Sequence, residues 1–489
     1  MKISVVPEPQ KIEIKTEQPV FTLTRLAEIT ADAESKKGLC SLLSFLKKAF
    51  EIEPLGTGKE SVELKIGKDI PEKEGYRLTV SENRAVIEGA DEAGIFWGVQ
   101  TFCTLLFEND CSLCALEIYD WPLIEKRGFM LDCSSWFFTV EAVKLFLDAM
   151  AAHKLNVFHW LLTGDAGWRL ELFDNFLLAQ IGGYRAYTGL GKVPHGGYYS
   201  REDTEEIIRY AHERCITVIP EISLPDRTTA AVAAYPQLNC FDKKVLVATD
   251  FGEQKNALCL GKESSYDFLY SVLDETAKVF PDKIICIGGE KVEKTNRDGC
   301  LHCKEKMRSL SLQNEEELYE YFLDCAKKHL DKLGIKTVIR AGKLTLPGGA
   351  IYDCKTAETA RIAKNKGAMC IDSSLELSKP YALLGVEECY GKDILKTANL
   401  FAVEAVLKTE SVPTMKKAGE LLFPRLGAFS ESVWTKKENR SYPHFLEKLD
   451  DYYRLIEFLP FDHAKKKQAF PGVFKKAGEN IKRRFKKNL

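Results

Sequence analysis

Residues 127–172 read RGFMLDCSSWFFTVEAVKLFLDAMAAHKLNVFHWLLTGDAGWRLEL, and this stretch decides the fold class. Its two apolar runs, residues 127–133 and 155–160, have the composition of short buried strands. Between them, residues 139–153 place apolar side chains at helical spacing, so that one face of a helix is apolar. A strand, an amphipathic helix and a second strand within about 30 residues form the repeating unit of a parallel sheet.

The rest of the chain continues this alternation of strands and helices. Six further apolar runs follow, at residues 216–222, 283–289, 336–341, 349–354, 367–372 and 396–401. Helical patterns separate most of them, for instance at residues 315–334. Eight strands with helical crossovers over about 300 residues favour a closed barrel over an open sheet. We therefore predict an α/β protein with a (β/α)₈ TIM barrel at residues 126–440.

Two smaller regions flank the predicted barrel. Residues 1–125 contain short alternating runs, such as KIEIK at 11–15 and YRLTV at 76–80, which predict a small α+β domain. Residues 441–489 are predicted to form a basic helical extension, because residues 464–489 carry ten basic side chains and one acidic side chain. This helix either docks on the barrel or binds an anionic partner such as a lipid surface or a polyanion.

The composition is that of an ordinary soluble globular protein. The chain has 489 residues, a formal net charge of −2 and 45% hydrophobic residues, so it has no global bias toward nucleic acid. No apolar stretch approaches the length of a membrane span, and residues 1–14 lack the apolar core of a signal peptide. Fifteen scattered cysteines without such a leader indicate a cytoplasmic protein. No phosphate-binding loop or dinucleotide fingerprint stands out, so we predict no cofactor.

Several stretches, in their order along the chain, resemble the family-20 β-N-acetylhexosaminidases. They are residues 127–172, YYSREDTEEIIRYAHERCITVIPEISLP at 198–225 and IGGEKVEKT at 287–295. The likeness covers almost the whole chain, from VVPEPQKIEI at 5–14 to LLFPRLGAFSESVW at 421–434. It implies a TIM barrel that hydrolyses N-acetylhexosaminides with the help of the substrate's own 2-acetamido oxygen. In the family, an Asp orients that acetamido group, and the adjacent Glu protonates the leaving oxygen and later activates water.

The catalytic pair that the resemblance implies is altered. Where the family has Gly-Gly-Asp-Glu after the fourth strand, this sequence has Gly288-Gly289-Glu290-Lys291. The extra methylene of Glu290 moves its carboxylate, and a misplacement of about 1 Å can cost about 100-fold in rate. Lys291 puts an ammonium where the family has its proton-donating acid. Glu290 and Lys291 thus occupy the predicted catalytic positions, and ordinary hexosaminidase activity is predicted to be lost or altered.

Other positions of the family's sugar-binding pattern are also changed. Ser135 stands at the position of an Arg that grips the sugar, and Arg227 at that of a His. Asp165 is the one carboxylate kept from an Asp-Asp pair. The family's Asn-Leu-Trp-Thr-Glu in the last strand is matched to residues 399–403, so that Phe401 replaces a stacking Trp. The predicted substrate-binding residues are Ser135, His159, Asp165, Trp168, Glu221, Arg227 and Phe401.

Two functions remain open. In the first, the barrel has lost ordinary turnover and binds a carbohydrate. Its mouth would then be more cationic than that of the family and would suit an anionic sugar. The side chains that would make it cationic are Arg227, Lys291, Arg340 and Lys343. A barrel that only binds partners through its basic carboxyl-terminal helix overlaps with this interpretation.

In the second function, the protein is an active glycosidase that removes terminal N-acetylhexosamine or an anionic sugar. Glu290 would then support the substrate-assisted attack, and another group would supply the proton. The candidates for that acid are Asp165, Glu221 and Glu293, besides a Lys291 whose pKa is lowered by burial and by neighbouring cations.

Two Cys-x-x-Cys pairs each supply half of a zinc-ligand set. They are Cys111 with Cys114, and Cys300 with Cys303, between which lies His302. A complete site would need the two pairs to meet in space, although they are far apart in the sequence. Members of the family often carry a Cys-x-x-Cys after the fourth strand that does not serve catalysis. We therefore predict no metal site.

Overall fold

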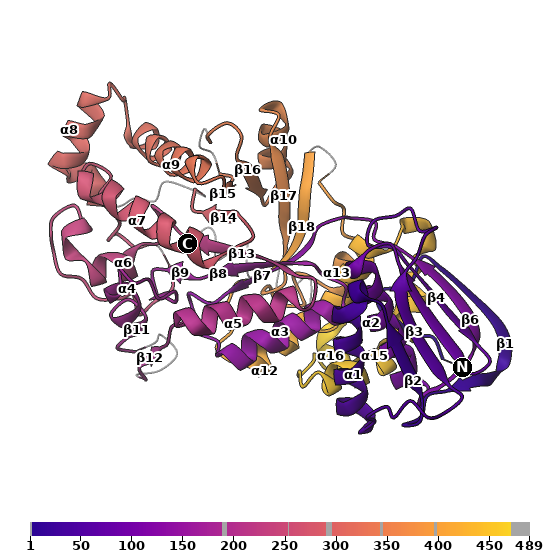
Figure 1. Ribbon diagram of the computed structural model, residues 1–489. Helices are drawn as coiled ribbons and strands as arrows, with labels where there is room; N and C mark the ends of the chain where they lie inside the picture. The colour runs from indigo at the N-terminus through magenta and orange to yellow at the C-terminus, as the bar shows by residue number, and fades with distance from the viewer. Residues whose placement is uncertain are drawn as a thin grey trace.

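A computed structural model describes residues 2–187, 193–252, 254–289, 296–342, 346–395 and 399–470. Over these ranges the chain forms an amino-terminal sheet domain and a closed barrel, which lie against each other (Figure 1). Glu290 and Lys291, and the basic helix predicted at the carboxyl terminus, lie outside the described residues. Among the described helices, none combines the length and the hydropathy that crossing a bilayer demands.

The amino-terminal domain is a six-stranded mixed sheet with two long helices. The sheet has the order β1-β6-β4-β5-β3-β2. Its strands are β1 (Lys11–Thr22), β2 (Glu28–Ala31), β3 (Ser61–Ile66), β4 (Tyr76–Ser81), β5 (Arg84–Gly89) and β6 (Ser112–Asp120). The helices are α1 (Lys36–Phe50), which follows the short η1 (Ala33–Ser35), and α2 (Glu92–Glu108). Helix α2 packs on the sheet and faces the barrel, which confirms the predicted α+β domain (Figure 1).

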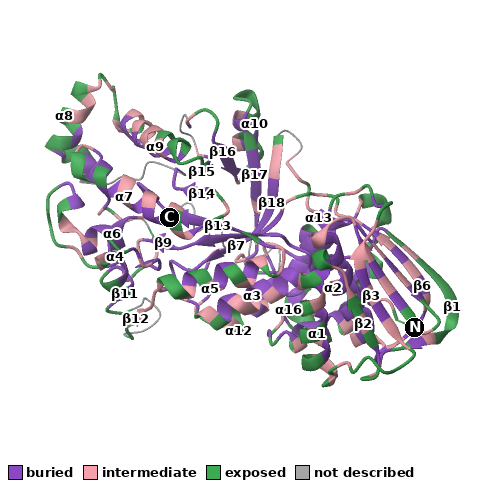
Figure 2. Cartoon of the chain, in the orientation of Figure 1, coloured by how far each residue is buried: buried purple, intermediate pink, exposed green. Residues whose placement is uncertain are grey.

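The second domain is the predicted TIM barrel. Its parallel strands close in the order β13-β14-β15-β16-β17-β18-β7-β8. They are β7 (Arg127–Asp132), β8 (Val157–Leu161), β13 (Thr217–Ile222), β14 (Ile284–Ile287), β15 (Lys336–Arg340), β16 (Ile351–Cys354), β17 (Met369–Glu376) and β18 (Asn399–Leu407). Figure 2 shows these strands largely buried, whereas exposed residues concentrate on outer helices such as α8 (Leu301–Ser309) and α10 (Ala357–Asn365).

Helices cover the outside of the barrel. The longer ones are α3 (Val140–Ala152), α5 (Arg201–His212), α7 (Glu263–Val279), α9 (Glu315–Lys332), α12 (Met415–Leu422) and α13 (Arg425–Trp434). Shorter elements are β9 (Thr163–Gly164), β10 (Gly167–Trp168), α4 (Leu177–Gln180), β11 (Tyr184–Arg185), β12 (His195–Gly196), α6 (Thr229–Ala234), η2 (Pro236–Leu238), η3 (Asn296–Gly299) and α11 (Val386–Tyr390). After η4 (Lys437–Asn439), the described part of the carboxyl-terminal region forms α14 (Tyr442–Glu447), α15 (Leu449–Phe458) and α16 (Lys466–Ala469).

The eighth barrel strand ends later than the sequence predicts. The apolar run at 396–401 was expected to be this strand, whereas β18 continues to Leu407. Glu404 interrupts the apolar pattern, yet its side chain is fully buried inside the barrel, where it contacts His159. A charged residue that is paired in the interior therefore explains the error in the predicted boundary.

A buried carboxylate, Asp120, joins the two domains. It is inaccessible to solvent and accepts hydrogen bonds from Tyr76 Oη at 2.7 Å within its own domain. From the barrel it accepts bonds from Lys154 Nζ at 2.8 Å and from Trp434 Nε1 at 2.9 Å. Beside it, Arg127 at the start of β7 forms a second buried ion pair across the boundary, with Glu74. Two buried ion pairs, Asp120–Lys154 and Glu74–Arg127, therefore hold the two domains together.

We expect Lys154→Met to destabilise the protein strongly, because Asp120 then remains buried without its cation. Breaking a buried ion pair by removing one partner typically costs about 3–5 kcal/mol. Urea unfolding followed by tryptophan fluorescence measures this loss. Lys47→Met is the matched control, since Lys47 pairs with Glu53 in an exposed position and should leave the midpoint nearly unchanged. Equal midpoints for the two variants would contradict a structural role for the Asp120–Lys154 pair.

Candidate functional site

A cavity of about 350 Å³ opens at the carboxyl ends of the barrel strands. Residues at or after the ends of β7, β8, β13, β14, β15 and β18 line it. In TIM barrels this face carries the active site. Phe251 is the one aromatic residue in the described lining, so the cavity offers little surface on which a sugar ring could stack.

Four of the predicted substrate-binding residues line this cavity. They are Ser135, Asp165, Glu221 and Arg227. The predicted catalytic residues Glu290 and Lys291 lie outside the described residues, but Gly288 and Gly289, which immediately precede them in the sequence, line the cavity.

Two further predicted residues lie elsewhere. Trp168 is buried in the hydrophobic core, and its Nε1 donates to the carbonyl of Leu170 at 2.9 Å. His159 is fully buried inside the barrel between Glu404 and Glu221. Neither side chain belongs to the cavity lining, so both are buried structural residues beneath or beside the cavity.

The register of the last strand gives Phe401 a different position from the predicted one. Parallel pairing of β18 with β7 places Val403 opposite Arg127 and Leu407 opposite Leu131, so Phe401 lies at the amino end of the barrel. There its ring has Lys126 Nζ 4.9 Å from its centroid and lines a separate pocket. Phe401 therefore lies at the end of the barrel opposite the cavity, which is not where the prediction expected it.

Lys408, Thr409 and Glu410 follow the carboxyl end of β18 instead. The match of the family's Trp-Thr-Glu to residues 401–403 therefore does not place those residues at the end of β18. Lys408 and Glu410 both line the cavity. Glu410 therefore supplies a carboxylate to the cavity from beyond the end of the last strand.

Asp132 braces the cavity where β7 and β18 end. Its Oδ1 accepts from the backbone N–H and the hydroxyl of Ser134, at 2.9 and 2.8 Å. Its Oδ2 accepts from Ser135 Oγ at 2.8 Å and from the backbone N–H of Thr409 at 3.2 Å. The Ser135 hydroxyl therefore donates to Asp132, and the Asp132 carboxylate is occupied by hydrogen bonds from the loops that follow β7 and β18.

A chain of buried charges lies below the cavity. Arg340 grips Glu221 with two hydrogen bonds, Nε to Oε1 at 2.7 Å and Nη2 to Oε2 at 2.5 Å. Its Nη1 also lies 3.5 Å from Asp353 Oδ2. On the other side of Glu221, His159 has Nε2 3.1 Å from Glu221 Oε2 and Nδ1 2.9 Å from Glu404 Oε2. Side chains from β8, β13, β15, β16 and β18 thus meet in one network.

The network fixes the protonation states of its members. Burial alone would lower the pKa of His159, but Glu404, with Cys286 and Glu221, outweighs burial and raises it well above its usual value. Burial alone would raise the pKa of Glu221, but Arg340 and His159 hold it well below its usual value. Glu221 is therefore an ionised partner of two cations and is unsuited to donate a proton.

The same network contains a possible ligand set for a metal ion. Donor atoms of His159, Glu221 and Cys286 all lie within 4.8 Å of one another. However, His159 and Glu221 are committed to each other and to Glu404 and Arg340, and burial raises the pKa of the Cys286 thiol to about 12. This set does not fit a metal cation.

The described lining is acidic rather than cationic. It contains the carboxylates of Asp132, Asp165, Glu221, Asp226, Asp250 and Glu410, and the cations Arg227, Arg340 and Lys408. Arg340 is neutralised by Glu221, and Arg227 Nη1 lies 3.9 Å from Glu410 Oε1. The other two lysines of the predicted cationic mouth, Lys291 and Lys343, lie outside the described residues.

Asp165 is a carboxylate of the cavity lining whose pKa is raised. Burial raises its pKa, although the backbone N–H and the hydroxyl of Thr229 donate to Oδ1 at 3.0 and 2.6 Å and oppose that shift. The sequence analysis named Asp165 because the resemblance matches it to one carboxylate of the family's Asp-Asp pair. Glu404, Lys408 and Glu410 were missed because their strand was thought to end at Phe401.

Comparisons with known proteins agree on one family. A model described as glycosyl hydrolase family 20, catalytic domain, matches residues 125–345, and one described as domain 2 of that family matches residues 2–121. A β-hexosaminidase of Porphyromonas gingivalis is 31% identical over 92% of this chain, and the chain spans 62% of that relative's length.

Two solved structures have the same fold over almost the entire chain. An exo-β-N-acetylglucosaminidase from Vibrio harveyi, in complex with N-acetylglucosamine, has a TM-score of 0.84 and 25% identity, and the match covers 95% of this chain and 78% of that one. A β-N-acetylhexosaminidase from Streptomyces coelicolor has a TM-score of 0.81 and 27% identity, with 95% and 98% covered.

The buried charge network predicts a dependence of stability on pH. The folded protein holds the His159 proton to a higher pH than the unfolded chain does, so the stabilisation is complete below pH about 6.5 and is lost as the pH rises toward the folded pKa. In that window, each rise of one pH unit lowers the free energy of unfolding by about 1.4 kcal/mol. Between pH 6 and 8 we therefore expect the wild type to lose about 2 kcal/mol more than the double variant His159→Gln/Glu404→Gln.

Urea unfolding at both pH values measures this difference. Other groups that titrate in the window, such as Glu431, whose pKa burial raises to about 8, are present in both proteins and cancel. If the free energy of unfolding changes equally with pH in the wild type and in the double variant, His159 is neutral in the folded protein.

Proposed function

Because the chain belongs to glycosyl hydrolase family 20, we propose that its barrel cavity binds a carbohydrate and that ordinary β-N-acetylhexosaminidase turnover is lost or strongly reduced. One observation carries the proposal: Lys291 stands where the family has its general acid. An ammonium of pKa about 10.4 is a poor proton donor at neutral pH. It also adds positive charge beside a sugar carbon that becomes cationic in the transition state.

The charge network supports this proposal. Glu221 cannot replace the missing acid, because Arg340 and His159 hold its pKa low. Asp132 cannot do so either, since five donors that follow the ends of β7 and β18 occupy its two oxygens. General acid–base catalysis typically contributes 10²–10⁴-fold to the rate, so losing it leaves at most slow turnover.

A residual glycosidase activity is the second candidate function. Asp165 favours it, because this carboxylate lines the cavity and burial raises its pKa. It would act as the acid while Glu290 supports the substrate's acetamido group. Glu410 could accept hydrogen bonds from sugar hydroxyls in either case.

The charge of the described lining favours a neutral ligand over an anionic one. The lining holds six carboxylates and three cations, and the Glu221–Arg340 pair removes one of each, which leaves five carboxylates and two cations. A sulfated or uronic sugar would be repelled by the remaining carboxylates, whereas the hydroxyls of a neutral sugar can donate to them. We therefore propose a neutral N-acetylhexosamine-containing carbohydrate as the ligand class, as in the Vibrio harveyi complex.

We expect the purified protein to hydrolyse 4-nitrophenyl N-acetylglucosaminide and galactosaminide no faster than its Glu290→Gln/Lys291→Met variant. Nitrophenolate leaves without being protonated, so this substrate is the most permissive one for an enzyme without a general acid. Release of nitrophenolate measures the rate. The variant Glu290→Asp/Lys291→Glu, which restores the family's pair, is the positive comparison and should be faster than the wild type. Wild-type turnover that disappears in Glu290→Gln/Lys291→Met would refute the loss of activity and favour the residual glycosidase.

We expect N-acetylglucosamine to raise the thermal unfolding midpoint at least as much as its 6-sulfate does, because the described lining is acidic. Glu410→Gln should weaken the effect of the neutral sugar, since one hydroxyl-accepting carboxylate is lost. Glu438→Gln, an exposed position outside the cavity, is the matched control. Stabilisation by the sulfated sugar alone, abolished in Lys408→Met, would show that the ligand is anionic.

A further inference from the structure

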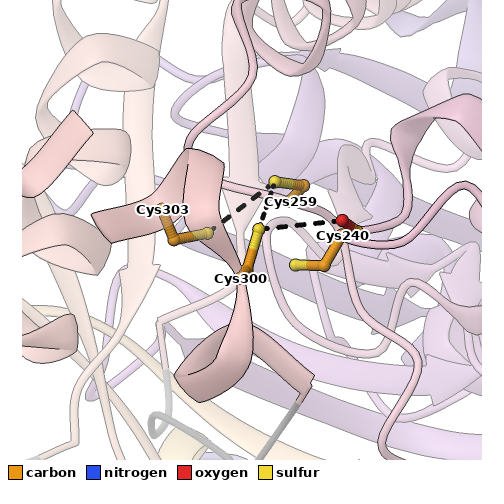
Figure 3. A group of neighbouring side chains, drawn as sticks. All are labelled: Cys240, Cys259, Cys300 and Cys303. Atoms are coloured by element: carbon orange, nitrogen blue, oxygen red, sulfur yellow. Dashed lines mark hydrogen bonds between the residues drawn. The ribbon is translucent and has the colours of Figure 1, made fainter. Parts of the chain in front are cut away.

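Four cysteines from three separate segments of the chain lie together (Figure 3). They are Cys240, Cys259, Cys300 and Cys303, and their sulfurs all lie within 4.8 Å of one another. All four side chains are buried. The Cys111–Cys114 pair lies in the amino-terminal domain and takes no part. The sequence analysis weighed only a site made of the two Cys-x-x-Cys pairs and predicted no metal site, whereas Cys300 and Cys303 lie beside Cys240 and Cys259.

The distances between the sulfurs suit a shared cation. Cys259 Sγ lies 3.6 Å from Cys300 Sγ and 3.7 Å from Cys303 Sγ. In a tetrahedral site with zinc–sulfur bonds of about 2.3 Å, neighbouring sulfurs are about 3.8 Å apart. A disulfide needs about 2.05 Å and joins sulfurs in pairs, whereas Cys259 is equally close to two partners.

The backbone delivers the four sulfurs in two pairs. Asn239 and Leu258 form an isolated antiparallel bridge, and Cys240 and Cys259 directly follow its two residues. The backbone N–H of Cys259 reinforces this bridge by donating to Leu238 at 2.8 Å. Cys300 and Cys303 lie at the start of α8, which begins at Leu301. Two cysteines from a loop bridge and two from a Cys-x-x-Cys at a helix start are a common ligand pattern of structural zinc.

Gly261 allows the two pairs to come together. A Cβ at this position would lie 2.1 Å from the carbonyl carbon of His302 and 2.3 Å from the backbone nitrogen of Cys303. The segment that carries Cys259 therefore packs directly on the backbone of the Cys-x-x-Cys turn.

The segment held by the cluster lacks regular structure of its own. Described residues 239–252 and 254–262 contain no helix or strand beyond the single bridge. A connection of this length without secondary structure is uncommon in a compact domain. A metal ion stabilises such a segment directly, because its binding free energy adds to the free energy of folding.

We propose that Cys240, Cys259, Cys300 and Cys303 bind one structural Zn²⁺ ion as four thiolates. The ion closes the segment between β13 and α7 onto the segment between β14 and α9. The first of these segments supplies Asp250 and Phe251 to the cavity wall. The second leads from Gly289 through Glu290 and Lys291 to Cys300 in the sequence. The zinc ion therefore holds parts of the cavity wall in place without contacting a ligand in the cavity.

Metal analysis of the intact protein, purified under reducing conditions, tests this proposal. We expect one zinc per chain, a lower thermal unfolding midpoint after removal of the ion by a chelator, and recovery of the midpoint on adding zinc. Cobalt added to the reduced apoprotein should give the thiolate-to-cobalt charge-transfer band and the visible bands of a tetrahedral four-sulfur site. Absence of zinc in the wild type together with no cobalt spectrum would overturn the proposal, and so would a disulfide between any two of the four cysteines in the isolated protein.

Variants locate the ion. Cys300→Ser should lose the zinc, whereas the exposed Cys40→Ser and the partly buried Cys325→Ser retain one zinc per chain. A full zinc content in Cys300→Ser would refute the site. If Cys300→Ser does not fold, the cobalt spectrum of the wild type still decides the question, because it reports the number and type of ligands.

Discussion

The ion pair between Glu221 and Arg340 is the interaction on which the barrel interior depends. It joins β13 to β15, and through His159, Glu404 and Asp353 it reaches β8, β18 and β16. Buried ion pairs are often no more stabilising than apolar side chains of the same shape, but removing one partner is strongly destabilising. A substitution of any one of these residues therefore leaves a buried charge without its partner and destabilises the floor of the cavity.

This constraint bears directly on what the cavity can do. A carboxylate at the end of the third strand would ordinarily be available to a ligand, but here it is occupied by a guanidinium from two strands away. The result is a polar cavity whose best-placed carboxylates, Glu221 and Asp132, already serve the protein's own frame. What remains for a ligand are the carboxylates at the rim, chiefly Asp165 and Glu410.

The sequence predicted the architecture well because its main signal is local. Apolar runs of four to seven residues and amphipathic helices between them identify a barrel without knowledge of any contact. The prediction failed at β18, where Glu404 breaks the apolar run because its partner, His159, comes from a strand far away in the sequence. That single error displaced the predicted strand end by six residues. It placed Phe401 among the predicted site residues and left Glu410 out of them.

The site was less predictable than the fold, since its properties arise from pairs. The family resemblance pointed to Ser135, Asp165, Glu221 and Arg227, which all line the cavity, but it did not indicate that Arg340 neutralises Glu221. The cysteine cluster shows the same limit. Cys240 and Cys259 stand alone in the sequence, and only the bridge between Asn239 and Leu258 brings them together.

The interface around Asp120 also has a consequence for the order in which the chain folds during synthesis. Besides Lys154, Asp120 contacts the backbone of Gln10 near the start of the chain and the indole of Trp434 near its end. Gln10 in turn donates to the carbonyl of Trp434 at 2.9 Å. The amino-terminal domain therefore emerges from the ribosome first but reaches its final state among the last, when α13 arrives. Until then Asp120 has the donors of its own domain, Tyr76 and Gln10, but not Trp434. During this period the nascent chain is open to chaperones and proteases.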